Sequence, residues 1–230
     1  MFKSKQFYMG VIGKYALFTD PMSKGGGEKF TYQIPTMQAL RGIVEANYWK
    51  PTLKFLIDEV KVLKSIQTET KSILLPMLNG GKDLSYFTYL KDVAYAVKFH
   101  FEWALERTDL KEDRNEKKHE QIILRSLSRG GRHDIFLGTR ECVGEIYKIT
   151  EEEYIKLNSP YSGNISFGIM FNSFTYGELD GKLYSNFAPV IMKNGVVNFL
   201  RPEECTIRHE LHNYKIKEFK NYTYRNIDEE

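Results

Sequence analysis

The chain has 230 residues, 42% of them hydrophobic, which is enough for one sizeable domain or for one domain with a smaller appendage. The net charge of +3 is too small to indicate a nucleic-acid partner by itself, and the isolated Cys142 and Cys205 argue against a disulfide framework or a zinc ribbon. Because there is no signal-peptide core and no run of ~18 apolar residues, we expect a soluble, cytoplasmic protein without a membrane partner.

The first third of the chain predicts a strand followed by a helix. Residues 7–18 mix β-branched and aromatic side chains and favour a strand. The stretch PTMQALRGIVEANYWKP has apolar residues at helical spacing and predicts a helix that starts at Pro35 and Thr36. It is expected to end at or near Tyr48 and Trp49, before Pro51. Arg41 precedes Tyr48 by seven residues, so a helix places both on nearly the same face.

The middle of the chain predicts more strands around a second helix. Asp113 and Glu116 have the spacing of a capping box, and Gly130 is a natural helix end. Further strands are expected at 60–70, 84–105 and 134–149. The order strand, helix, strand, strand, helix, strand is the ferredoxin-like pattern of RRM-type RNA binders.

The residues after 150 are strand-rich, and Asp180–Gly181 and Asn194–Gly195 are placed for tight hairpin turns. The sequence therefore predicts an α+β protein with two parts. A ferredoxin-like (RRM-like) N-terminal domain is expected over residues 1–150, and a small antiparallel β-sheet region over residues 151–230.

Positive charge is concentrated in one segment, between residues 117 and 140. Six cationic residues there face only two acidic ones, a local balance of +4 that exceeds the charge of the whole chain. They are Lys117, Lys118, Arg125, Arg129, Arg132 and Arg140. On a helix Arg125 and Arg129 each lie within ~20° of Lys118. The glycines of SRGGRHD let backbone and guanidinium groups approach a phosphate. This segment is a candidate phosphate-binding surface, and an ordinary flexible loop is the alternative for SRGGRHD.

His119 stands behind two lysines in the stretch EKKHEQ. Neighbouring positive charge and a helix N-terminus both disfavour the imidazolium ion, so the ring is expected to be neutral and able to accept a proton. On a helix His119 lies between the basic stripe and the apolar face, where it can be half buried and still reach a ligand. The alternatives are a solvated helix face and a core-edge histidine with a backbone partner.

His209 and His212 form the stretch HELH, whose spacing of three differs from the spacing of four in zinc-protease helices. No later ligand is evident, so we predict neither a metal nor another cofactor. A polar strand or a surface helix is the expected structure.

Four stretches together resemble the Cas-five family of CRISPR-associated proteins, in its subtype I-C (Dvulg-type) branch. They are GKYALFTDP, PTMQALRGIVEANYWKP, KHEQIILRSLSRGGRHDIFLGTREC and GKLYSNFAPVIMKNGVV. The resemblance implies a RAMP-superfamily fold and an endoribonuclease that cleaves precursor CRISPR RNA at a repeat hairpin. It also implies that the protein then stays bound to the RNA, with the other subunits of the type I-C Cascade complex as partners.

The catalytic tyrosine of the family matches Tyr48, and its lysine and histidine match Lys118 and His119. The resemblance implies metal-independent attack by the ribose 2′-OH, with His119 as general base or acid, Lys118 stabilising the phosphorane and Tyr48 as a hydrogen-bonding group. Charge and position suggest an RNA-binding set of Arg41, Lys50, Arg125, Arg129, Arg132 and Arg140. A non-catalytic RNA-binding scaffold subunit and a metal hydrolase that uses His209 and His212 are the competing hypotheses.

Overall fold

The computed structural model describes residues 2–213 except 22, 24–26, 79 and 178–180. The helices are α1 (Met37–Asn47), α2 (Glu116–Leu127) and α3 (Glu151–Lys156), with 3₁₀-helices η2 (Thr108–Asp113) and η3 (Pro202–Glu204). The strands are β1 (Phe7–Ala16), β2 (Lys29–Phe30), β3 (Leu53–Val62), β4 (Thr68–Pro76), β5 (Lys82–Trp103), β6 (Ile135–Phe136), β7 (Val143–Lys148), β8 (Asn164–Tyr176), β9 (Lys182–Lys193), β10 (Val196–Asn198) and β11 (Ile207–Asn213).

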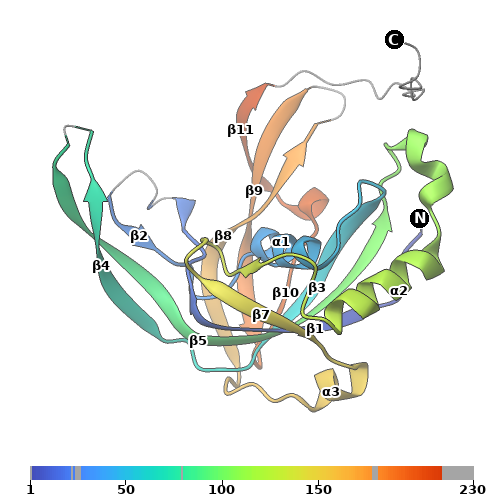
Figure 1. The fold of residues 1–230 in the computed structure, drawn as a ribbon, viewed down its shortest axis with the longest axis horizontal. Coiled ribbons are helices and arrows are strands. Elements are labelled where there is room, and N and C mark those ends of the chain that lie inside the picture. Colours follow the sequence, from blue (N-terminus) through green and yellow to red (C-terminus); the bar gives the residue numbers. More distant parts are fainter. Residues whose placement is uncertain (1, 22, 24–26, 79, 178–180, 214–230) are drawn as a thin grey trace, which may run out of the picture.

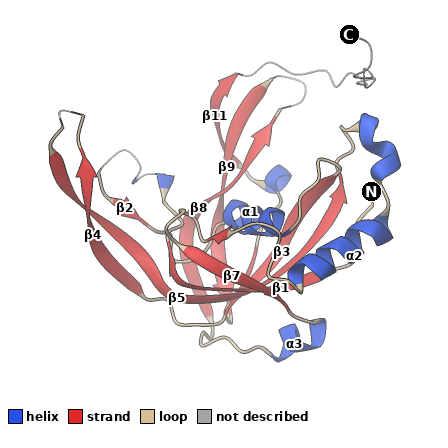
Figure 2. Cartoon of the chain, viewed as in Figure 1, coloured by secondary structure: helices blue, strands red, loops and turns tan. Residues whose placement is uncertain are grey.

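Within the described residues these strands join into one sheet whose path is β11-β9-β10-β3-β5-β1-β7-β6 (Figures 1 and 2). Strands β4 and β8 pair with β5 and β9, and β2 is the one strand of these that pairs in parallel, with β5. The protein is therefore α+β and mostly antiparallel, which agrees with the predicted fold class at this level. No helix in the described part of the chain is long and apolar enough to span a membrane.

Strand β5 organises the sheet because its 22 residues pair with several neighbours. Its first part pairs with β4 and its second part with β1 and β3. Asp92 has a φ of 50° and is missing from the pairing with β1, although the register on either side of it is unchanged. The β4–β5 hairpin projects away from the rest of the sheet (Figure 1).

Two predicted strands are divided in the structure. The strand expected at 60–70 is the end of β3 and the beginning of β4, and the one expected at 134–149 is β6 followed by β7. Gly138 lies between the latter two with a φ of +97°, and a Cβ there would come within 2.0 Å of the Leu17 main-chain oxygen. The close approach of these two chain segments therefore requires glycine, and it ends the strand.

Helices α1 and α2 cover one face of the sheet and α3 covers the other. Leu40 of α1 and Ile123 of α2 share a core cluster with Met9 of β1, whereas Tyr154 of α3 packs on Tyr8 of β1. This division follows from strand geometry, since consecutive residues of β1 point to opposite faces. Side chains of α1 and α2 can therefore meet on the same side of the sheet.

The helix boundaries follow local capping. The Thr36 side chain accepts a hydrogen bond from the Ala39 amide at the start of α1, and the helix ends at Tyr48, as predicted. Asn115 caps α2, because its side chain accepts from the Lys118 amide at 3.1 Å. The predicted capping box of Asp113 and Glu116 is thus wrong, and Asp113 belongs to η2.

The turn predicted at Asn194–Gly195 is confirmed, with φ of 49° and 80° between β9 and β10. The turn predicted at Asp180–Gly181 falls partly on Asp180, which lies outside the described residues. Strand β10 pairs with β9 on one side and with β3 on the other. The strands after residue 150 therefore continue the sheet of the strands before it.

Candidate active site

Tyr48 and His119 lie in contact, although they are 71 residues apart in the chain. The Tyr48 hydroxyl oxygen is 2.9 Å from His119 Nδ1. Tyr48 follows the last turn of α1 in an extended conformation, with φ −158° and ψ 128°, which directs its side chain inward. A hydrogen bond of 2.7 Å from the Ser126 hydroxyl to the Asn47 main-chain oxygen further ties the end of α1 to α2.

The hydrogen-bond partners of His119 define its neutral tautomer. Nε2 lies 2.8 Å from the main-chain oxygen of Asp113, and because a carbonyl oxygen can only accept, Nε2 must carry the hydrogen. Nδ1 of the neutral ring therefore accepts from the Tyr48 hydroxyl. A phenol, an imidazole and a carbonyl arranged in this way can move a proton from the phenol oxygen to the ring.

The His119 side chain is fully buried, with 0% of it exposed, so the half-buried position expected from the helix pattern is wrong. Its ring meets Phe101 and Trp103 of β5 at centroid distances of 6.3 and 5.8 Å, and η2 supplies the carbonyl at Nε2. Helix periodicity could not show this burial, because the cover comes from β5 and η2 rather than from α2 itself.

The pKa of His119 is lowered, first by burial and less by the charges of Lys118 and Lys50, while the Asp113 carbonyl and carboxylate oppose the shift. The predicted neutral ring is confirmed, but its main cause is burial rather than the neighbouring lysines. Burial also raises the pKa of Tyr48, and the Asp113 charge adds to this. The phenol consequently stays protonated at neutral pH and acts as the donor to Nδ1.

Asp113 connects the two residues of the KKH stretch. Its carboxylate forms an ion pair with the Lys118 ammonium, accepts a hydrogen bond of 2.7 Å from Thr52 Oγ1 and lies 3.5 Å from His119 Nε2. Burial alone would raise the pKa of Asp113, but the hydrogen bonds from Lys118 and Thr52 outweigh it and lower that pKa. Sequence reasoning missed this role, for which the available signal was an acidic residue just before a helix that begins with lysines and a histidine.

Three of the predicted RNA-binding arginines line one pocket of about 330 Å³: Arg125, Arg129 and Arg132. Arg129 lies beyond the end of α2, so the predicted helical stripe is wrong in detail, and Lys118 is not part of this pocket lining. The cations converge because the chain turns at the two glycines 130 and 131, which have φ of 80° and 102°. The Arg132 guanidinium also lies over the Tyr48 ring, 5.3 Å from its centroid, so the pocket adjoins the Tyr48–His119 pair.

The other three predicted RNA-binding residues lie apart from this pocket. Arg140 is beside the Phe136 ring between β6 and β7, at 5.8 Å, and Lys50 is exposed after α1. Arg41 pairs with Glu45 at 2.7 Å and lines a different groove. The expected common face of Arg41 and Tyr48 is wrong, because Tyr48 has left the helical conformation.

His209 and His212 lie in the exposed strand β11, which agrees with the expected polar strand. Among the residues that the structure describes, no group of three or more His, Cys, Asp and Glu is placed to hold a metal ion. Cys142 and Cys205 are buried and form no disulfide.

The comparisons with known proteins agree on one family. The Cas5d model of the CRISPR-associated Cas5 proteins matches residues 9–200. A protein of Mannheimia succiniciproducens named CRISPR pre-crRNA endoribonuclease Cas5d is 26% identical over 82% of this chain and 92% of its own length. A protein of the same name from Thermus thermophilus is 30% identical over 57% of this chain and 58% of its own length.

Two crystal structures are similar over 91% of this chain. One, described as a CRISPR-associated protein, is 45% identical with a TM-score of 0.78, and 98% of its chain is covered. The other, the functionally uncharacterized SMU1763c from Streptococcus mutans, is 44% identical with a TM-score of 0.77, and 99% of its chain is covered. The resemblance drawn from the sequence motifs is therefore confirmed, and the chain belongs to the Cas5d family of CRISPR-associated proteins.

Proposed function

We propose that this protein is a CRISPR pre-crRNA endoribonuclease that cleaves the repeat hairpin without a metal ion. Its family membership and the shared name of the Mannheimia and Thermus relatives support the activity. The observation that carries the site assignment is the 2.9 Å hydrogen bond between Tyr48 and His119. Lys118 precedes His119 in the chain. These are the catalytic residues that the family resemblance implied.

In the proposed mechanism the ribose 2′ oxygen attacks the neighbouring phosphorus and the bond from phosphorus to the 5′ oxygen breaks. The 2′-OH proton passes to the Tyr48 oxygen while the Tyr48 proton moves to His119 Nδ1. Lys118 stabilises the charge of the phosphorane. The departing 5′ oxygen takes a proton from water, so the products are a 2′,3′-cyclic phosphate and a 5′-OH.

The Tyr48–His119 pair must become accessible to RNA for this mechanism to operate, because only 1% of Tyr48 is exposed. Arg132 connects the ring to the pocket that it shares with Arg125 and Arg129. A phosphate bound in that pocket would draw the Arg132 guanidinium away from the ring. In this proposal the RNA itself opens the site.

The proposed RNA partner is the repeat hairpin with its flanking strand. The cations assigned to it are Arg41, Lys50, Arg125, Arg129, Arg132 and Arg140, of which the pocket arginines would lie nearest to the cut. We propose further that the protein stays bound to the product as a subunit of the type I-C Cascade complex. The region after residue 150 is the candidate surface for contacts with other subunits, and Ile155, Ile169 and Ile191 are exposed there.

The proposed architecture is a ferredoxin-like domain over residues 1–150 and a β region over residues 151–230. The neighbour order β3-β5-β1-β7 and the position of α1 and α2 on one face support the ferredoxin-like part. The pairing of β10 with β3 means that the two parts share a sheet rather than a flexible linker.

A non-catalytic RNA-binding scaffold is the second candidate function. The complete burial of His119 favours it, because a scaffold needs no accessible imidazole.

Cleavage of labelled repeat RNA in excess EDTA separates these functions. We expect cutting by the parental protein, and no cutting of a substrate with a 2′-deoxy nucleotide at the scissile position, which should still bind. His119→Ala should reduce the single-turnover rate by about 10² to 10⁴. Cleavage of the deoxy substrate, or activity that EDTA removes and added metal restores, would refute the mechanism. A protein that binds but never cuts supports the scaffold.

A further inference from the structure

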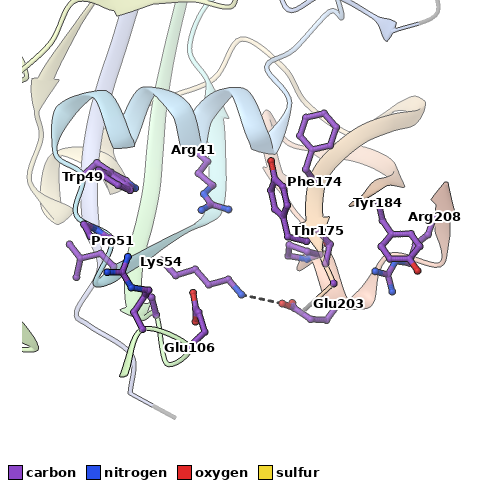
Figure 3. A pocket seen from close by; sticks show the side chains of 16 residues that line it. Arg41, Trp49, Pro51, Lys54, Glu106, Phe174, Thr175, Tyr184, Glu203 and Arg208 are labelled. Carbon is purple, nitrogen blue, oxygen red and sulfur yellow. Dashed lines mark hydrogen bonds and ion pairs between the residues drawn. The ribbon is translucent and has the colours of Figure 1, made fainter. Parts of the chain in front are cut away.

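The residue after Tyr48 faces a second site. Tyr48 is extended, so its neighbour Trp49 points the opposite way, and Trp49 is 55% exposed whereas Tyr48 is 1% exposed. Trp49 lines a groove of about 800 Å³ (Figure 3). One wall comes from α1 and the turn that follows it, and the opposite wall from β8, β9, η3 and β11. The groove therefore begins where the proposed catalytic segment reaches the surface.

Exposed aromatic rings are present on both walls of this groove. Phe174 and Tyr176 at the end of β8 are 41% and 63% exposed, and both line it opposite Trp49. Exposed rings of this size are costly to leave in water, and their flat faces can stack with any nucleobase.

Cationic side chains accompany the aromatic rings. The Arg208 guanidinium lies 4.6 Å from the centroid of the Tyr184 ring, and Lys54 pairs with Glu203 at 3.3 Å. The described lining has four cations, namely Arg41, Lys54, Arg107 and Arg208, and two carboxylates, namely Glu106 and Glu203. Arg41 and Arg107 are also paired at 2.7 Å with Glu45 and Asp109, which lie outside the lining. Ion pairs as exposed as Lys54–Glu203 are weak, so a phosphate can compete for the ammonium group.

We propose that this groove binds single-stranded RNA, with Trp49 as the platform on which an unpaired base stacks. Aromatic faces for bases and cations for the backbone are the combination by which proteins hold unpaired strands. This proposal rests on the proposed function, because the bound strand would be the single-stranded flank of the repeat beside the cut. The sequence of the strand is not read by stacking, so the groove fits any flank.

Intrinsic fluorescence can report on Trp49 directly, because the chain has only two tryptophans, Trp49 and Trp103. Trp103→Phe leaves Trp49 as the single tryptophan. Titration of this variant with a single-stranded oligoribonucleotide that lacks the hairpin should quench its fluorescence with saturation.

The matched variants are Trp49→Ala and Trp49→Phe in the parental background. With a repeat RNA that carries the single-stranded flank and a 2′-deoxy scissile nucleotide, Trp49→Ala should weaken binding by about 5- to 150-fold, the range for loss of one stacked base. Trp49→Phe should retain most of the affinity, and neither variant should lower the melting temperature, since Trp49 is exposed. Removing the flank from the RNA should abolish the difference between the two variants.

These assays test the groove assignment and the proposed nuclease activity independently. Quenching and the Trp49→Ala effect without any cleavage would refute the proposed nuclease and leave the groove assignment intact. Normal cleavage with no quenching and equal affinity of Trp49→Ala would refute the groove assignment alone. A Trp49 signal that responds to the other Cascade subunits and not to RNA would also refute it, since the occupant would then be protein.

Discussion

Removal of the Tyr48 hydroxyl separates chemistry from packing. Tyr48→Phe keeps the ring in its buried position but leaves His119 Nδ1 without its donor. An unsatisfied buried polar atom costs about 1 to 3 kcal/mol. For a chain of this size each kcal/mol lowers the melting temperature by about 2 to 4 °C, so we expect a decrease of roughly 2 to 12 °C.

If the Tyr48 oxygen carries the 2′-OH proton to His119, the same variant should lose about 10²- to 10⁴-fold in single-turnover cleavage. Its affinity for the 2′-deoxy repeat RNA should be unchanged, because no cation is removed. The assay is cleavage of labelled RNA by excess protein at a temperature well below the melting point of the variant.

Tyr154→Phe is the matched control. The Tyr154 hydroxyl also donates a side-chain hydrogen bond, which is partly buried, to Glu59 Oε1 at 2.9 Å, but Tyr154 lies on the opposite face of the sheet. This variant should also lose stability, by less because Glu59 keeps its ion pair with Lys98, and it should cut at the parental rate. Parental cleavage by folded Tyr48→Phe would refute the proton relay and reduce the Tyr48–His119 bond to a structural role.

Three further predictions test the surroundings of the pair. The folded-state pKa of His119 lies below its ordinary value of 6.5, so just below pH 6.5 the proton binds the unfolded chain in preference to the folded one. The melting temperature should therefore fall as the pH drops below about 6.5. His119→Gln should not show this decrease. Asp113→Asn removes a charge that raises the pKa of His119, so the His119 pKa of this variant should be lower still. Between pH 6.5 and 5 its melting temperature should fall more steeply than that of the parental protein. An identical slope would contradict the interaction between Asp113 and His119. Arg125→Ala with Arg129→Ala should weaken RNA binding and reduce the log-log salt slope by about 1.4, at roughly 0.7 per single-strand phosphate contact, whereas an unchanged slope would place the RNA elsewhere.

The parts of the fold that were predicted correctly depend on local chemistry. Thr36 starts α1 because its side chain caps the helix, and Asn194–Gly195 forms its turn because both residues adopt positive φ. The cap of α2 was misassigned by two residues, to Asp113 in place of Asn115, since both side chains suit a cap.

The parts that were not predicted depend on distant segments. The proximity of Tyr48 and His119 came only from the family resemblance, because no residue pattern relates positions 71 apart. The burial of His119 depends on Phe101 and Trp103 of β5, and the role of Asp113 depends on η2 closing over the ring. Helical periodicity describes one element and therefore carries no information about which residues of β5 and η2 bury His119.

The pairing of β10 with β3 also determines when the protein can finish folding during synthesis. Lys61 of β3 pairs with Val196, which leaves the ribosome 135 positions later. Until then this edge of β3 presents unpaired amide and carbonyl groups, the kind of edge that recruits strands from other chains. A nascent or truncated chain that stops near residue 150 should therefore aggregate more readily than the full chain, and a chaperone that shields this edge would raise the yield of folded protein.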